Sequence, residues 1–490
     1  MLNKKKPNPV VLFCSYVCLV MGALLILPLM MSLFEVGTLD QEVFALICAL
    51  CLIIGYLGVK LNLNSFEEIS SKELYLTTIC SWLILGFIGA LPFLFALQKI
   101  TITDALFESF SGITTTGSTV LSNLSQMPPS LLLWRGILQW VGGIGIVVLS
   151  IAVLPHLKVG GMKLFATESS DWSSKTHPRA NKMIVSILSI YILLTFTCAL
   201  IYLIGGMNAF DAVVHAMTTL STGGFANYDS SFGYFSHNPI LIWTANTFMV
   251  LGALPFVFYV NLLSRSHRNF GVDSQILGFF KVLGITIFSL TIVRSFTSDE
   301  TMFEILNHVC FNIISVITTT GFASTDYTLW GEFAVMFFFY LMFIGGCSGS
   351  TSGSVKIFRY QLAYLMLKSQ LRRMTHPNGV YVLKYNQRLV DDGIIRSVVA
   401  FSIMFVLTIA IIAMLLTLFG LDFITSISAA ATAVTNVGPG LGDTIGPSGN
   451  FSSLPDLAKI LLCVGMLVGR LEVMTVFVVL TPSLWNRWNR

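Results

Sequence analysis

Four short stretches of this chain join small polar or β-branched residues to a glycine, a combination that can present backbone and hydroxyl oxygens to an ion. The four glycines lie 106, 98 and 117 residues apart along the chain. Each stretch follows an apolar run that is too short to cross a bilayer. The stretches are Thr115, Thr116 and Gly117; Ser221, Thr222 and Gly223; Thr319, Thr320 and Gly321; and Asn436, Val437 and Gly438. The spacing predicts four copies of one unit of about a hundred residues.

These stretches suit a cation, although none of them carries a formal charge. A short helix that ends at the centre of a membrane directs the negative end of its macrodipole there. Glycine adopts backbone angles that other residues avoid, so its carbonyl oxygen can face an axis, where a ring of carbonyls replaces the hydration shell of an ion. One copy alone is an ordinary turn after a helix. Four copies favour a filter for a large monovalent cation.

The composition places the chain in a membrane. Of its 490 residues, 55% are apolar and 11% are charged, against about 25% charged in soluble domains. The mean hydropathy is +0.80. Nine cysteines lie almost entirely in apolar runs, and Cys48 and Cys51 share a helix face, so we interpret that pair as packing residues and not as metal ligands. The composition predicts a polytopic membrane protein.

Apolar segments near twenty residues predict ten membrane crossings. They cover about 9–31, 42–59, 74–97, 132–154, 183–206, 239–263, 275–297, a helix from 333 to about 357, 394–420 and 456–481. Half-length segments at 104–112, 209–220, 303–317 and 422–434 lead into the four stretches. The predicted fold class is an all-α polytopic membrane protein with four parallel helix–pore-helix–helix repeats in pseudo-fourfold symmetry plus an N-terminal two-helix hairpin.

Five units follow from this pattern. They are an N-terminal transmembrane hairpin (1–70), pore repeat one (71–160), pore repeat two (161–270), pore repeat three with a cytoplasmic basic loop (271–392) and pore repeat four (393–490).

The basic residues predict the orientation. With the N-terminus inside, inner segments hold 22 of the 28 lysines and arginines, which fits the positive-inside rule. Both termini are then cytoplasmic, and all four stretches enter from the outer face. Two inner loops, 156–182 and 356–392, are long enough to meet a soluble partner, although membrane anchoring explains the basic residues of the second equally well. We expect membrane lipid around the chain and no nucleic acid.

A run of glycine and serine interrupts the predicted helix from 333. The residues that stand out are Gly345, Gly346, Gly349, Ser350, Thr351 and Gly353. Glycines four residues apart could also form a packing stripe between helices. Because such a run breaks a helix and lies under the filter, we favour an intramembrane gate.

Arg470 lies within the last apolar segment, where a buried arginine is costly and faces the bundle interior or water. Glu472 is two residues away and cannot face it on a helix, so each needs a partner elsewhere. Arg470 is then either half of a structural ion pair or an electrostatic barrier below the filter. We include it with the gate.

The other candidates are weaker. His215 and His308 lie in half-length segments without a second ligand at metal spacing, so we interpret both as hydrogen-bonded packing residues. Asp104 and Glu108 could cap the first half-helix or tune the outer vestibule, and capping is favoured for Asp104.

The chain resembles the Trk/Ktr/HKT superfamily of potassium transporters, and within it the bacterial TrkH type. The matching motifs are Thr-Thr-Thr-Gly-Ser, Ser-Thr-Gly-Gly-Phe, Thr-Thr-Thr-Gly-Phe and Asn-Val-Gly-Pro-Gly-Leu-Gly. The N-terminal hairpin resembles the extra helix pair of TrkH-type members. In plant relatives a serine at the first filter glycine accompanies sodium transport, whereas this chain has Gly117.

The resemblance implies K⁺ as the transported ion, with no cofactor in this chain. It also implies a bacterial plasma (inner) membrane location, a homodimer and a cytosolic nucleotide-binding regulatory subunit like TrkA. The family carries a loop and an arginine at the places of residues 345–354 and Arg470, which fits the gate. The coupling ion stays open.

Three alternatives were weighed. A potassium-binding subunit of a P-type ATPase complex shares the pore plan. A cation symporter would need inverted repeats and an ionisable site at mid-membrane. An intramembrane enzyme would need a nucleophile set that the sequence lacks, so we expect no enzymatic activity.

Overall fold

The computed structural model describes residues 8–35, 40–62, 70–152, 177–263, 273–379, 381–386, 388–482 and 485. The described chain is mostly helical, because apolar helices satisfy their own backbone hydrogen bonds in lipid. A short antiparallel ribbon pairs β1 (Lys384–Tyr385) with β2 (Arg388–Leu389). The all-α expectation is confirmed.

The N-terminal hairpin consists of α1 (Pro9–Ser32) and α2 (Asp40–Asn62). Small residues let the two helices approach closely. A Cβ atom at Gly22 would lie 2.9 Å from the Leu52 side chain, and one at Gly55 would lie 2.7 Å from that of Leu19. The hairpin packs on α3 and α5 and, as predicted, lies outside the repeats.

The first two repeats follow the predicted order of long helix, short helix and second helix. Repeat one contains α3 (Ser71–Ala96), α4 (Ile102–Ile113), the turn η1 (Leu124–Gln126) and α5 (Pro129–Ala152). Repeat two contains α8 (His177–Ile204), α9 (Ala209–Leu220), the turn η2 (Ser231–Phe235), α10 (Pro239–Ala253) and α11 (Phe256–Leu263).

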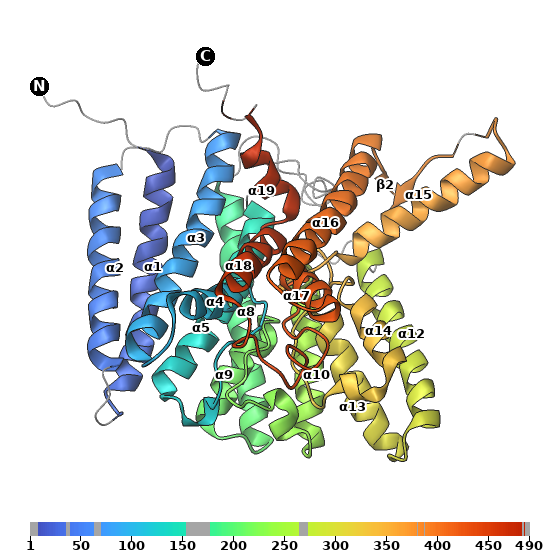
Figure 1. The fold of residues 1–490 in the computed structure, drawn as a ribbon. Helices are drawn as coiled ribbons and strands as arrows, with labels where there is room; N and C mark the ends of the chain where they lie inside the picture. Colours follow the sequence, from blue (N-terminus) through green and yellow to red (C-terminus); the bar gives the residue numbers. More distant parts are fainter. Residues whose placement is uncertain are drawn as a thin grey trace, which may run out of the picture.

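The last two repeats have the same order. Repeat three contains α12 (Ser274–Thr297), α13 (Met302–Ile317), the turn η3 (Tyr327–Trp330), α14 (Glu332–Leu341) and α15 (Ile357–Thr375). Repeat four contains α16 (Asp392–Leu418), α17 (Phe423–Thr435), α18 (Asp456–Arg470) and α19 (Val473–Leu480). In Figure 1, α1 begins and α19 ends at the top of the bundle, and α15 projects away from it.

The second helices differ from the prediction in three repeats. The predicted single helix 239–263 bends by 90° between α10 and α11, and the predicted helix 456–481 bends by 107° between α18 and α19. Pro255 lies in the first break, where it offers no backbone N–H, and Glu472 lies in the second with a φ of +64°. The predicted helix from 333 ends at Leu341 and resumes at Ile357.

The count of crossings changes accordingly. Among the described residues, seven helices are long and apolar enough to span a membrane, or nine if each bent pair is one span. The remaining predicted crossing, the helix from 333, consists of the ten-residue helix α14 and the non-helical segment after it. Only in repeat one is the second helix, α5, unbroken.

Candidate functional site

The four short helices begin at side-chain caps. Asp422 caps α17, and hydrogen bonds from the Thr425 side chain and backbone N–H hold the pKa of the Asp422 carboxyl below its ordinary value. The other caps are Thr101 for α4, Asn208 for α9 and Thr301 for α13. Each cap satisfies an N–H of the first turn, which explains why the chain starts a helix there.

Each short helix leads into a residue with left-handed backbone angles. These residues are Thr115, Thr222, Thr319 and Asn436, with φ values of +53°, +52°, +59° and +56°. Such angles are costly for β-branched threonine and persist only where the surroundings enforce them. We call the four predicted stretches quarters one to four, in chain order. The shared backbone geometry aligns them independently of their sequences.

A hydrogen bond confirms this alignment in every quarter. The residue after the left-handed one donates its N–H to the carbonyl five residues earlier, over 2.8–3.2 Å. The donors and acceptors are Thr116 and Ser111, Gly223 and Thr218, Thr320 and Ser315, and Val437 and Thr432.

The glycine of quarter two is therefore Gly224 and not Gly223. The glycine with positive φ follows the hydrogen-bonding residue in each quarter, at Gly117 (+88°), Gly224 (+77°), Gly321 (+81°) and Gly438 (+113°). The predicted set Ser221, Thr222 and Gly223 is thus one residue too early. Aligning Gly224 and Phe225 with Gly321 and Phe322 would have revealed the register.

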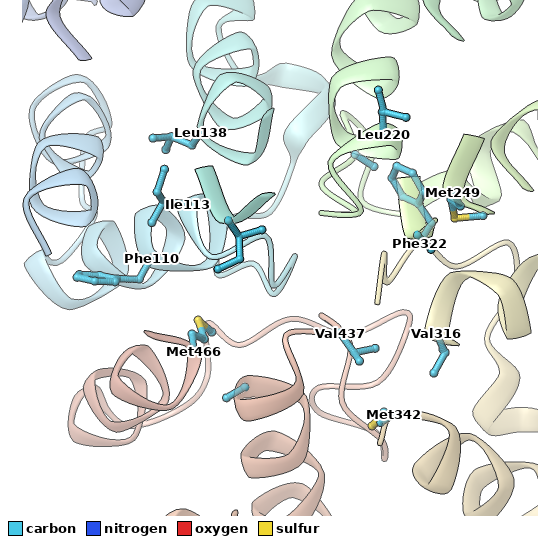
Figure 2. Packing of buried hydrophobic residues seen from close by; sticks show 14 of the residues in the cluster. Phe110, Ile113, Leu138, Leu220, Met249, Val316, Phe322, Met342, Val437 and Met466 are labelled. Atoms are coloured by element: carbon cyan, nitrogen blue, oxygen red, sulfur yellow. The ribbon is translucent and has the colours of Figure 1, made fainter. Parts of the chain in front are cut away.

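The four glycines and their neighbours close a ring. A Cβ atom at Gly117 would lie 2.3 Å from the carbonyl oxygen of Gly223. An added Cβ atom at Gly224 would lie 1.8 Å from the Thr320 carbonyl oxygen. One at Gly321 would lie 2.0 Å from the Val437 oxygen, and one at Gly438 would lie 2.8 Å from the Thr116 oxygen. Each quarter thus touches the next, and only a residue without a side chain fits. Figure 2 shows Ile113, Leu220, Val316 and Val437, one from each repeat, around this centre.

The predicted site residues are buried together, and two of their oxygens lack partners. Every polar side chain among them is fully buried at the inner ends of the short helices. Asn436 donates from Nδ2 to the Thr116 hydroxyl over 2.9 Å and links quarters four and one. Thr115 Oγ1 and Asn436 Oδ1 have no hydrogen-bond partner in the described part of the chain. Such oxygens can accept a dehydrated cation.

The predicted gate residues other than Arg470 lie in the non-helical segment 342–356, which we call the inner loop. Thr351 donates two hydrogen bonds to the Gly252 carbonyl, one from its hydroxyl over 3.0 Å and one from its backbone N–H over 3.2 Å. Gly353 donates its N–H to Thr319 Oγ1 over 2.7 Å. The loop is therefore bonded directly to a residue of quarter three and to the last turn of α10, just before the break in repeat two.

The glycines of the inner loop do not form a helical packing stripe. Gly345 donates its N–H to the Val355 carbonyl over 2.9 Å, and a Cβ atom at Gly353 would lie 2.5 Å from the Thr435 carbonyl oxygen. Gly349 has a φ of +77° and open space around it. Ser350 donates its hydroxyl to the Cys347 carbonyl within the loop, and the Gly346 carbonyl accepts the N–H of Ile357, the first residue of α15.

Arg470 lies at the end of α18 and touches the inner loop. It donates from Nη1 to the Thr351 carbonyl over 2.8 Å and from Nη2 to the Gly142 carbonyl over 3.3 Å. No ion pair among the described residues includes Arg470. The structural ion-pair alternative is therefore not supported, and Arg470 has different partners from Glu472, as predicted.

A buried cationic cluster beside Arg470 was not foreseen. Arg359 pairs with Glu472 over 2.6 Å, and its guanidinium lies 3.7 Å from the centre of the Phe401 ring. Lys356 is also buried and donates to the Ser352 carbonyl. The signal in the sequence was the pair of basic residues where the inner loop meets α15, Lys356 and Arg359.

The weaker candidates mostly have structural roles. Asp104 lies in the first turn of α4 and pairs with Lys459 over 2.6 Å, whereas Glu108 is fully buried and pairs with Arg135 over 2.8 Å. His215 contacts the Asp211 carbonyl over 2.9 Å, and His308 contacts the Ser324 hydroxyl over 3.0 Å. The two histidines are hydrogen-bonded, as predicted. Among the described residues, no three His, Cys, Asp or Glu side chains gather as a metal site.

Comparisons with known proteins agree with this architecture. The sequence profile of the TrkH family, described as a cation transport protein, matches residues 40–486. A protein from Halomonas elongata named Trk system potassium uptake protein TrkI is 48% identical over 98% of this chain and 97% of its own length. The Trk system potassium uptake protein TrkH of Escherichia coli is 36% identical over 87% of this chain and 88% of its own. The crystal structure of the potassium transporter TrkH from Vibrio parahaemolyticus superposes with a TM-score of 0.90 at 29% identity, covering 99% of this chain and all of that one.

Proposed function

The chain belongs to the TrkH family of cation transport proteins, and from that membership we propose that it takes up K⁺ through a central filter built by the four glycine-containing turns. The observation that carries the proposal is the closed ring of Gly117, Gly224, Gly321 and Gly438, each against a carbonyl oxygen of the next quarter. A ring of backbone oxygens without formal charge suits a weakly hydrated monovalent cation.

The proposed filter residues contribute different kinds of oxygen to the ion. The carbonyl oxygens of the residues before the ring glycines (Thr116, Gly223, Thr320 and Val437) replace water around the ion. The hydroxyls of Thr115, Thr222 and Thr319 and the amide oxygen of Asn436 add acceptors at the inner end. The macrodipoles of the four short helices add partial negative charge at the same place. Ser221 completes the predicted set as the C-cap of α9, directly before the filter.

The inner loop and Arg470 form the gate in this proposal. The loop lies against filter quarter three through Gly353 and Thr319 and is held by Arg470 through the Thr351 carbonyl. A guanidinium at the inner end of the path repels a cation that leaves the filter. Opening requires the loop to separate from Arg470, and the open space around Gly349 gives the backbone room to move.

The location and units follow the family. We place the chain in a bacterial plasma membrane with both termini cytoplasmic, and we keep the five units 1–70, 71–160, 161–270, 271–392 and 393–490. The basic loop 356–392 and the loop 156–182, most of which lies outside the described residues, would then face the cytosol.

The exposed face of α15 supports a homodimer. Tyr360, Tyr364, Leu367, Leu371 and Met374 are exposed at spacings of four and three residues, so they form one apolar stripe. We assign this stripe to a second copy of the chain. Lys368, Arg372 and Arg373 on the same helix suit a cytosolic nucleotide-binding regulatory subunit like TrkA. Light scattering of a Leu367→Lys, Leu371→Lys variant should report a monomer, and an unchanged dimer mass would reject this assignment.

Ion flux into liposomes tests the transport proposal. Purified protein should carry Rb⁺, a substitute for K⁺, far faster than Na⁺. Gly117→Ser should abolish that preference, because the added side chain would meet the Gly223 oxygen. Gly206→Ser is the matched control, since Gly206 has a φ of +103° with nothing within 4 Å of its Cβ position. Equal Rb⁺ and Na⁺ flux through the wild type would reject the proposal.

A further inference from the structure

Each filter quarter is held from behind by a side chain of its own short helix. We call residues 118–121, 225–228, 322–325 and 439–442, which follow the ring glycines, the return segments. The Val120 N–H donates to Glu108 Oε2 over 3.0 Å, and the Ser324 N–H donates to Asn312 Oδ1 over 3.1 Å. In both cases the acceptor lies twelve residues before the donor. The same spacing therefore recurs in two quarters, although the accepting side chains differ.

Quarters two and four use other acceptors at the same place. The Asn227 N–H donates to His215 Nε2 over 3.5 Å, again twelve residues apart. His215 Nδ1 faces the Asp211 carbonyl, which can only accept, so the proton is on Nδ1 and Nε2 is free to accept. In quarter four the equivalent residue is Ala429, and its neighbour Ser428 accepts from the Leu441 N–H over 3.1 Å. The acceptors are thus a carboxylate, an imidazole, an amide and a hydroxyl.

The carboxylate in quarter one is unique because it is clamped by an arginine. Arg135 of α5 donates from Nε to Glu108 over 2.8 Å, and both side chains are buried. From there Arg135 reaches across to quarter two, where Nη1 donates to the Ala226 carbonyl over 2.9 Å and the guanidinium lies 4.1 Å from the centre of the Phe225 ring. One ion pair therefore connects the return segments of two quarters.

A glutamine one turn further along α5 also joins quarters one and two. We call the contact between these two quarters the seam. Gln139 donates from Nε2 to the Gly223 carbonyl over 2.6 Å and accepts the Phe225 N–H at Oε1 over 2.9 Å. The Gly223 carbonyl belongs to the ring described above. Gln139 thus acts on a proposed ion-binding oxygen through a direct hydrogen bond.

The matching positions of two other repeats are apolar. Gly142, Gly252 and Gly469 occupy equivalent places, because a Cβ atom on each would press on the last carbonyls of its own short helix, at Ile113, Leu220 and Val434. Counting back from these glycines, Arg135 corresponds to Ala245 and Leu462, and Gln139 corresponds to Met249 and Met466. Both methionines are buried near the filter (Figure 2). The polar seam therefore belongs to quarters one and two.

We propose that Glu108, Arg135 and Gln139 are positioning residues that set the selectivity of the filter by fixing the seam between quarters one and two. The inference rests on the proposed function. Hydrogen bonds to charged groups are roughly twice as strong as neutral ones, so this seam resists deformation more than the others. A filter that cannot contract around a smaller ion discriminates against Na⁺, and one loosened seam is enough to lose that discrimination.

The test compares two carboxylates of the same helix. Glu108→Gln keeps the acceptor for Val120 but removes the charge that pairs with Arg135. Asp104→Asn is the matched control, because Asp104 pairs with Lys459 and none of its described hydrogen bonds reaches a return segment. Rb⁺ and Na⁺ flux are measured in liposomes, with thermal unfolding to check folding. Glu108→Gln should lower the Rb⁺ to Na⁺ ratio about tenfold, equivalent to about 1.4 kcal/mol, and Asp104→Asn should leave it unchanged.

Gln139→Met covers the case in which Glu108→Gln does not fold. It installs the residue that repeats two and four already have, with nearly the same volume, and should lower the ratio about threefold. A wild type without Rb⁺ preference would reject the proposed function itself. A selective wild type whose folded Glu108→Gln and Gln139→Met variants keep its ratio would overturn the present inference. A change of melting temperature without a change of ratio would show a merely structural role, which also overturns it.

Discussion

The four repeats are alike in one half of the bundle and differ in the other. In the proposed orientation, the half with the short helices and the glycine ring is the outer half, and the half with the inner loop is the inner half. In the outer half every repeat keeps the same parts: a capped short helix, a left-handed residue and a glycine against the next quarter. In the inner half α5 is straight, two second helices bend by 90° and 107°, and that of repeat three opens into a loop. The symmetry that the ring requires is absent directly beneath it.

In the proposed function, this difference matches the separate roles of filter and gate. A ring of oxygens around one ion needs four equivalent contributions, because the ion sits on the axis. A gate needs one element that moves while its neighbours stay fixed. One repeat must therefore differ from the other three. Specific hydrogen bonds join the two halves. Gly353 donates its N–H to Thr319 Oγ1 over 2.7 Å, and Thr222 donates its hydroxyl to Thr351 Oγ1 over 3.2 Å.

The largest expected effect is in the outer half. Gly224→Ala should reduce Rb⁺ flux at least about 100-fold, because a left-handed backbone alone costs about 1–3 kcal/mol and the new Cβ would lie 1.8 Å from the Thr320 oxygen. Gly223→Ala should be milder, since its Cβ would meet only the end of the Gln139 side chain. Equal losses from both variants would refute the register that places Gly224 in the ring.

In the inner half Arg470→Ala should act in the opposite direction. Removing the guanidinium frees the Thr351 carbonyl and lowers the barrier to cations, so Rb⁺ flux should rise about tenfold with an unchanged ratio to Na⁺. Arg470→Lys keeps the charge, so its Rb⁺ flux should lie between that of the wild type and that of Arg470→Ala. Flux that stays at the wild-type level in both variants would remove Arg470 from the gate.

Glu472→Gln tests whether the inner half also carries stability. Removing the Glu472 charge breaks its buried ion pair with Arg359 and should cost about 3 kcal/mol of unfolding free energy. Thermal or denaturant unfolding in detergent measures this loss. The selectivity ratio should not change, and a lowered ratio would mean that the two halves are less separate than the structure indicates.

The smallest effect is expected at a helix cap. Thr301→Ala removes the hydroxyl that begins α13 and should destabilise the protein by about 1 kcal/mol. Thr297→Ala is the control, because Thr297 is exposed and bonds only within its own helix, to the Val293 carbonyl. Identical melting curves for the two variants would argue against a capping role.

The sequence predicted the outer half better than the inner one, for physical reasons. Apolar length and cap residues such as Asp422 are local signals, so the long and short helices were found with small errors. Gly223 and Gly224 are adjacent, and only backbone angles decide which one enters the ring. The bend at Pro255 had a visible cause, whereas the break at Glu472 depends on a distant partner, Arg359. The acceptors that lie twelve or thirteen residues before their donors in the return segments share no residue type, so no pattern search would have grouped them.

The most direct test of the central claim is to locate the ion. Crystals grown with Rb⁺ should show an anomalous scattering peak inside the ring of residues 116, 223, 320 and 437, within coordination distance of their carbonyl oxygens. A Gly224→Ala crystal should lack the peak. A wild-type structure with no Rb⁺ peak in the ring, or with its strongest protein-bound peak elsewhere, would contradict the filter.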